Sequence, residues 1–140
     1  MPRKARPAPV AKAADSEKIT INLGFVDLGQ IDLLVAEGFY GNRSDLIRTA
    51  IRNQLASHAE VVKQAAARKM LVLGLHHVGA EDLRRAKAAR EKLQIRVLGL
   101  AVLADDVTPE LALATIESIE VLGALQASPA VKAALASRQR

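Results

Sequence analysis

The chain has 140 residues, of which 50% are apolar, so it can bury a core in one domain or in two small ones. It has no cysteine, which excludes disulfides, thiolate metal sites and a cysteine nucleophile, and it has no apolar run long enough to span a membrane. The net charge of +5 is concentrated in residues 1–16, where basic side chains outnumber acidic ones, whereas residues 17–68 are neutral overall. We therefore expect a cytoplasmic protein without a secretory signal.

Residues 1–16 consist largely of alanine, proline and basic residues without any periodicity, and we predict a disordered basic arm there. Such an arm either keeps the protein soluble or contacts DNA phosphates through its basic side chains. Those side chains are Arg3, Lys4, Arg6 and Lys12.

Residues 18–23 alternate strictly between polar and apolar side chains, the pattern of a half-buried β-strand. The polar row is Lys18, Thr20 and Asn22, and the apolar row is Ile19, Ile21 and Leu23. A single strand leaves its backbone N–H and C=O groups unpaired, and no partner strand precedes the helices that follow. We therefore expect the strand to pair with the same strand of a second copy.

Two helices are predicted after the strand. The first runs from about Phe25 to Glu37 and ends at Gly38, which we expect in a left-handed conformation. The second begins with Ser44 as its N-cap and continues to about Arg68.

This region resembles the ribbon-helix-helix family of DNA-binding regulators, the Arc and MetJ type. The resemblance is carried by KITINL at 18–23, by QIDLLVAEGFYGNRSDLIRTAIRNQL at 30–55, and by the turn between Gly38 and Gly41. It implies a dimer whose two strands form an antiparallel ribbon that enters the major groove of double-stranded DNA. The polar row Lys18, Thr20 and Asn22 would then contact bases, and phosphates would be held at the second helix by Asn42, Arg43, Ser44 and Arg48.

Each of these assignments has a plainer alternative. Thr20 is a good strand residue in any sheet, and Ser44 is fully explained as a cap. Asn22 favours the functional interpretation, because asparagine is a poor strand former but its amide can read adenine.

The second half of the chain contains the tripeptide VLG three times, at 72–74, 97–99 and 121–123. Strong helix-start signals follow the last two copies, at Thr108 with Pro109 and at Ser128 with Pro129, and a weaker one follows the first. We predict three strand-helix units with parallel strands, whose open edges could pair with another chain. The apolar positions assigned to the three helices are Leu83, Ala86, Ala89 and Leu93; Leu111, Ala114, Ile116 and Ile119; and Val131, Ala134 and Leu135.

No constellation for catalysis is visible. The histidines are His58, His76 and His77, and we expect no metal site because neighbouring strand residues point to opposite faces. Asp105 and Asp106 look like paired carboxylates, but their place before a helix start favours a turn. We predict no enzyme activity, no metal and no cofactor.

Taken together, the sequence predicts an α+β protein with an arm at 1–16, a ribbon-helix-helix domain at 17–68 and a strand-helix repeat domain at 69–140 that oligomerises or senses a ligand. The leading functional hypothesis is a nucleoid-associated, sequence-specific transcriptional repressor that acts as a dimer or a higher oligomer. The alternatives are an antitoxin that binds a toxin protein and regulates its own operon, and a filament-forming protein anchored to DNA.

Overall fold

The computed structural model describes residues 16–140. The predicted basic arm, with Arg3, Lys4, Arg6 and Lys12, lies outside the described residues apart from Ser16. Internal contacts divide the chain at Ala65 into an N-terminal unit, Lys18–Ala65, and a C-terminal unit, Ala66–Arg140. No helix in residues 16–140 is both long and apolar enough to cross a membrane.

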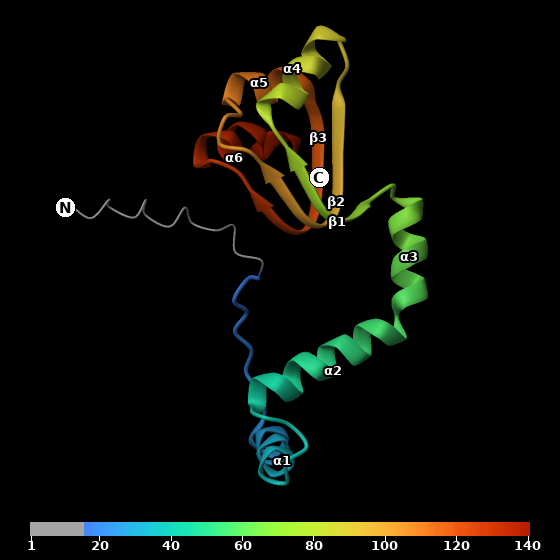
Figure 1. The fold of residues 1–140 in the computed structure, drawn as a ribbon, viewed down its shortest axis with the longest axis vertical. Helices are drawn as coiled ribbons and strands as arrows, with labels where there is room; N and C mark the ends of the chain where they lie inside the picture. The colour runs from blue at the N-terminus through green and yellow to red at the C-terminus, as the bar shows by residue number, and fades with distance from the viewer. Residues whose placement is uncertain (1–15) are drawn as a thin grey trace, which may run out of the picture. The chain divides into compact units, whose positions relative to one another are not determined.

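The N-terminal unit consists of an extended segment and two helices, with part of a third. Residues 18–24 form neither a helix nor a strand within one chain and follow an extended path (Figure 1), as expected for a segment whose backbone partner would lie in another copy. The helices are α1 (Phe25–Ala36), α2 (Arg43–Ser57) and α3 (Ala59–Arg68) (Figure 1). The predicted antiparallel ribbon needs a second chain and stays a prediction.

The end of α1 follows the sequence signal. Gly38 has a φ of 85°, and the amide of Phe39 donates to the carbonyl of Leu34 at 3.0 Å, which satisfies a carbonyl in the last turn of the helix. Helix α1 begins at Phe25 after Gly24, which provides no side-chain cap.

Two predictions for the second helix are wrong. Its N-cap is Asn42, whose side-chain oxygen accepts from the amide of Asp45 at 2.8 Å, and Ser44 lies inside the first turn. Asparagine caps at least as well as serine, so the earlier of two good caps sets the start. The helix also stops at Ser57 rather than continuing to Arg68, because His58 leaves helical geometry and the Ser57 hydroxyl donates to the carbonyl of Gln54.

The C-terminal unit alternates strands and helices, and the predicted parallel strands are confirmed. The strands β1 (Val72–Val78), β2 (Leu93–Leu103) and β3 (Ile116–Gln126) form one parallel sheet in the order β1-β2-β3. The helices α4 (Ala80–Ala88), α5 (Pro109–Thr115) and α6 (Pro129–Leu135) gather on the concave side of the sheet (Figure 1), and a 3₁₀ turn, η1 (Ala136–Arg138), follows. The chain is therefore α+β, with the sheet confined to this unit.

The caps that sequence identified in this unit are present. The side chain of Thr108 accepts from the amide of Leu111, and that of Ser128 accepts from the amide of Val131, each at 3.2 Å. A proline occupies the first helical position in both helices, where its missing N–H removes no hydrogen bond.

Three apolar positions assigned to helices belong to strands instead. Leu93 opens β2, and Ile116 and Ile119 lie in β3, where Leu93 pairs with Ile116. Helix α4 ends earlier than predicted because Arg90 adopts a left-handed φ of 57°. Helix α5 passes into β3 without a loop, so the apolar residues Ile116 and Ile119 that follow its pattern lie on a strand.

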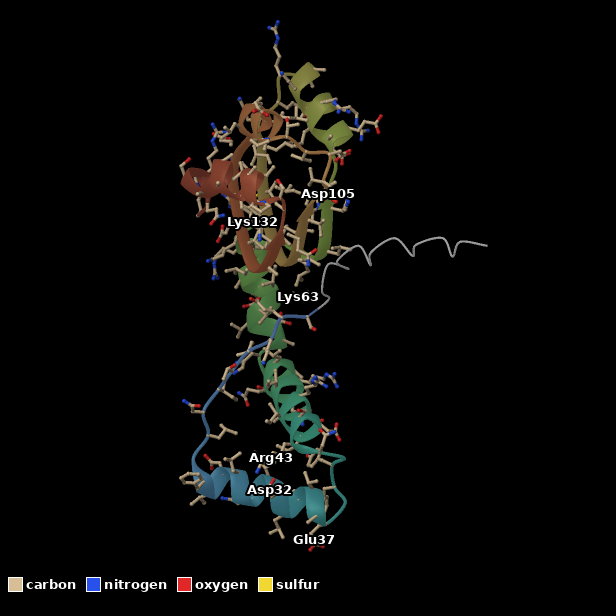
Figure 2. All side chains as sticks on the ribbon, turned by 90° about the vertical axis from the view of Figure 1, so that its left-hand side faces the viewer. Asp32, Glu37, Arg43, Lys63, Asp105 and Lys132 are labelled. Atoms are coloured by element: carbon tan, nitrogen blue, oxygen red, sulfur yellow. The ribbon has the colours of Figure 1, made fainter. Side chains whose placement is uncertain are left out.

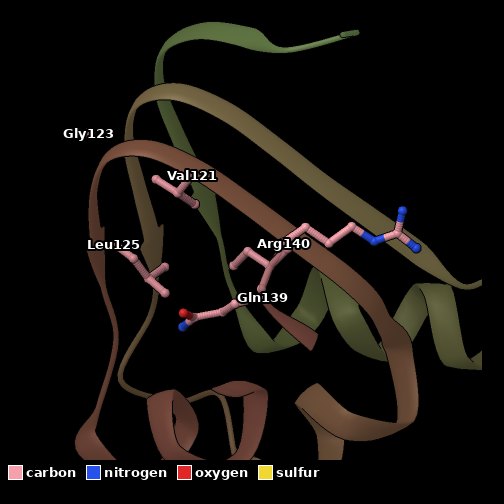
Figure 3. A pocket seen from close by; sticks show the side chains of 6 residues that line it. Val121, Gly123, Leu125, Gln139 and Arg140 are labelled. Carbon is pink, nitrogen blue, oxygen red and sulfur yellow. The ribbon is translucent and has the colours of Figure 1, made fainter. Parts of the chain in front are cut away.

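The three VLG tripeptides occupy equivalent positions of the sheet. Gly74 pairs with Gly99, and Gly99 pairs with Gly123, with the valines and leucines before them in the same register. All three glycines of this row have a left-handed φ, and the ribbon of β3 bends at Gly123 (Figure 3). A Cβ on Gly99 would overlap the carbonyl oxygen of Gly74, and one on Gly123 would overlap that of Gly99, so both positions require glycine.

The core of the C-terminal unit lies between the helices and the inner side of the bent sheet. Its largest fully buried side chains are Leu83, Val97, Thr115, Ile116, Ile119, Val131 and Leu135. Thr115 is the polar member, and its hydroxyl donates to the carbonyl of Leu111 at 2.7 Å. The hydroxyl of Thr115 is therefore satisfied within its own helix.

Candidate nucleic-acid interface

The N-terminal unit has no buried residue between Lys18 and Ala65, although it is rich in large apolar side chains. Ile19 is 79% exposed and Ile21 57% exposed, and both belong to the apolar row of the extended segment. The other exposed large apolar side chains of α1, the turn and α2 include Phe25, Val26, Leu33, Phe39, Ile51 and Leu55. Exposed apolar side chains in this number mark a protein interface, and one copy of the unit leaves them uncovered.

The polar row of the extended segment is fully available to a partner. Lys18, Thr20 and Asn22 are all exposed. Alternate residues of an extended chain point the same way, so these three side chains share one face, opposite the apolar face of Ile19 and Ile21. The segment can therefore present a donor-rich polar face while its other face is buried.

The start of α2 brings the predicted phosphate-contacting residues together. Asn42, Arg43 and Ser44 are consecutive at the N-terminus of the helix, and Arg48 lies one turn beyond Ser44 on the same side. All four are exposed. Amide groups at a helix N-terminus favour an anion, and the two arginines add positive charge.

Two acidic side chains also lie at this helix start, and sequence reasoning assigned only Asp45 a role there, as a negative charge that suits the helix dipole. Asp45 accepts from the amide of Gly41 at 2.9 Å, which closes the turn before α2. Asp32 of α1 forms a two-pronged ion pair with Arg43, with both guanidinium-to-carboxylate distances at 2.8 Å (Figure 2). The hydrogen bond from Arg43 lowers the pKa of Asp32, and that carboxylate raises the pKa of Arg43.

The ion pair ties α1 to α2 and holds the guanidinium of Arg43 in one place. No sequence signal could have revealed it, because the partners lie on different helices, 11 positions apart. Both side chains remain at least half exposed, so a phosphate can still approach Arg43 from solvent.

The candidate residues of the C-terminal unit do not assemble into a chemical site. His76 and His77 border an open hollow together with Asp82, Arg85 and Glu91, but no group of three or more His, Cys, Asp or Glu side chains in residues 16–140 could hold a metal ion. Asp106 accepts from the amide of Ala80 at 3.1 Å, and Asp82 accepts from the amide of Gly79 at 2.9 Å. Asp106 therefore caps the start of α4, in agreement with a structural role in a turn.

Comparison with known proteins supports the resemblance found in residues 18–55. The model of the Ribbon-Helix-Helix transcriptional regulator family matches residues 14–132, which include the extended segment, the helix pair and nearly all of the C-terminal unit. No curated protein and no solved structure matches the chain. The match covers most of the chain, and the chain therefore belongs to the ribbon-helix-helix transcriptional regulator family.

Proposed function

We propose that the protein is a sequence-specific transcriptional repressor that binds double-stranded DNA as a dimer. The observation that carries the proposal is the extended segment at 18–23, which exposes a polar row and an apolar row and has no strand partner among the described residues. Pairing two copies would bury the apolar rows against the helices and leave one polar face on a two-stranded ribbon. Such ribbons fit the major groove.

In this arrangement Lys18, Thr20 and Asn22 contact bases. A lysine donates to the acceptors of guanine, an asparagine amide pairs with the N6 and N7 edge of adenine, and a threonine contacts either a polar edge or the thymine methyl group. These three side chains supply the sequence information, because phosphate contacts carry none directly.

Asn42, Arg43, Ser44 and Arg48 hold the phosphate backbone and fix the register of the ribbon. Residues 17–68 carry as many acidic as basic side chains, so we expect weak binding to random DNA and a strong dependence on a few well-placed contacts. That balance suits a regulator that must discriminate among sequences.

The C-terminal unit assembles copies of the protein, and its exposed sheet edge supports this role. The antitoxin alternative is less well supported, because residues 66–140 already form an ordered core without a partner protein.

The test is selection of bound duplexes from random-sequence DNA at about 0.15 M salt, where binding through phosphates alone is suppressed. The wild-type chain should enrich one short symmetric or tandem motif. The variant Thr20→Ala/Asn22→Ala should lose that motif, whereas Thr49→Ala/Asn53→Ala, which removes the same side chains from α2, should retain it. Enrichment without a motif by the wild-type chain would contradict the proposal.

A further inference from the structure

The two edge strands of the C-terminal sheet, β1 and β3, differ in what pairs with their outer edges. At the β3 edge, the amide of Arg140 donates to the carbonyl of Ile119 at 3.0 Å, and Gln139 forms a parallel bridge with Ile119. Gln139 and Arg140 also border a cavity of about 220 Å³ under Val121 and Leu125 (Figure 3). Residues 138–140 therefore lie against β3, whereas β1 pairs only with β2 among residues 16–140.

The β1 edge is bare and apolar on both of its faces. Leu73 and Leu75, on the outer face, are 61% and 67% exposed, and Val72 on the inner face is also exposed. Strand β1 has no acidic or basic side chain other than its two histidines. Stacked strand-helix units normally need a polar cap at each end, and an uncapped apolar edge is a template for another strand.

The glycine row indicates where a further strand would fit. Gly99 and Gly123 each leave room for the carbonyl oxygen of the glycine in the preceding strand, so a Cβ at either position would overlap backbone. Gly74 has the same left-handed backbone, yet a Cβ there would meet no described atom within 4 Å. The space beside Gly74 is therefore open to the backbone of another strand.

We propose that the β1 edge pairs with the β1 edge of a second copy of this chain, antiparallel and centred on Gly74. This inference rests on the proposed function, since it names the surface through which the C-terminal units assemble. A two-fold axis through Gly74 is the arrangement in which the bends of the two strands coincide, and it places Leu73 opposite Leu75 of the partner. The two sheets then form one continuous, bent, six-stranded sheet.

A second copy of the same chain is the partner that best fits the β1 edge. Strand β1 begins at Val72, shortly after α3 ends at Arg68, so the bare edge is the part of the C-terminal unit nearest in sequence to the dimerising unit. Dimerisation through the ribbon holds two such edges at a high effective concentration. With no fixed charge on β1, two identical edges do not repel each other.

Cysteine cross-linking of the full chain tests the proposal, because the natural sequence has no cysteine. Leu73→Cys/Leu75→Cys places one thiol opposite the other across the two-fold axis. Two matched pairs occupy the same rows of the sheet, Leu98→Cys/Leu100→Cys on β2 and Leu122→Cys/Ala124→Cys on β3. Under mild oxidation, most of the first variant should run as a disulfide-linked dimer on a non-reducing gel, and the other two should remain monomeric.

Lysine variants test the edge without relying on a disulfide. Leu75→Lys should speed amide hydrogen exchange in β1, because edge lysines oppose strand pairing, and Leu122→Lys should leave β1 unchanged. Cross-linking at β3 as strong as at β1, or no cross-link together with no effect of Leu75→Lys, would overturn the proposal.

DNA selection with the same variants separates this proposal from the proposed function. If the β1 cross-link fails and Leu75→Lys has no effect on β1 while the DNA motif is retained, the edge pairing is wrong and the repressor proposal stands. If the cross-link forms but no motif is enriched, the edge pairing stands and the repressor proposal is wrong.

Discussion

Single side chains at the start of α2 set the balance between attraction and repulsion of DNA. Arg43 is the basic residue closest to the predicted phosphate position, and it is already paired with Asp32. A phosphate must share or displace this carboxylate. The ion pair therefore orients Arg43 at the expense of some affinity for DNA.

Asp32→Asn should tighten binding to all DNA sequences, because it removes a negative charge and leaves Arg43 free for a phosphate. We expect the slope of log affinity against log salt to steepen by up to about one. The measurement is a salt titration of the dissociation constant, with Glu37→Gln, an exposed acidic residue after α1, as the matched control. Weaker binding by Asp32→Asn would instead mean that the carboxylate is needed to orient Arg43.

Asn22→Ala should remove discrimination at one base position and leave binding to random DNA nearly unchanged. The expected loss is about 1–3 kcal/mol on the preferred site, the range for one good amide-to-base pair. Dissociation constants measured on single-base variants of the selected motif would show it. Asn53→Ala, the same change on α2, is the control, and equal loss on every sequence would contradict a reading role.

Acidification should weaken the C-terminal unit through Asp82. The hydrogen bond from the amide of Gly79 holds the pKa of Asp82 below its usual value of 3.8. Because the pKa of this carboxyl is lower in the folded state than in the unfolded state, its ionised form stabilises the fold at pH values above the unfolded-state pKa. This stabilisation is lost as the pH falls through the folded-state pKa. Asp82→Asn should therefore flatten the pH dependence of unfolding below about pH 4, where the carboxyl titrates, and Asp105→Asn serves as the matched control.

At the scale of the elements, the row of Gly74, Gly99 and Gly123 determines how the three strands bend. It lets three strands bend together so that one sheet lines the core both before and after the bend, while α4, α5 and α6 cover its inner side (Figure 1). The close approach of Gly99 and of Gly123 to the glycine carbonyl of the strand before it makes the bend a property of the whole sheet rather than of one strand.

Gly99→Ala should destabilise the protein far more than Gly74→Ala. At Gly99 the new methyl group would overlap the carbonyl of Gly74 and strain the left-handed backbone, which we expect to cost at least about 3 kcal/mol. At Gly74 the methyl group would meet no atom of the same copy, so within one copy only the backbone strain of about 1–2 kcal/mol remains. Chemical denaturation of both variants gives the comparison, and equal losses would show that the overlap at Gly99 is relieved by movement of the strands.

Local signals predicted much of the secondary structure, because their physical cause lies within a few residues. Thr108 and Ser128 cap their helices as expected, and Gly38 ends α1. Ile116 and Ile119 show why residue spacing alone can mispredict secondary structure, since apolar residues three positions apart fit one face of a helix but also occur in a buried strand. Whether residues 116–119 form a helix or a strand depends on their pairing with β2.

Other features depend on distant parts of the chain, so sequence could not provide them. The pairing of Asp32 with Arg43 follows from the way α1 and α2 meet, and the capping of α4 by Asp106 follows from the packing of β2 beside β1. The recurrence of VLG was visible in sequence, but the overlap that makes Gly99 and Gly123 necessary appears only when the strands are paired.

At the scale of the whole molecule, the two units differ in whether one copy of the chain buries an apolar core. The C-terminal unit has a core of its own, whereas the N-terminal unit has no buried residue from Lys18 to Ala65. Family membership implies dimerisation and DNA binding. Both are consistent with a unit whose core is completed by a second copy and whose polar face is left for DNA.

The proposed dimer depends on the pairing of residues 18–23 of two copies into one ribbon. The most direct measurement is amide hydrogen exchange of these residues in the full-length protein without DNA. In a paired ribbon, alternate amides of the segment should exchange slowly, and dilution toward the monomer should remove this protection. Fast exchange throughout residues 18–23 at high protein concentration, while the core strands β2 and β3 stay protected, would contradict the ribbon and the DNA-reading role built on it.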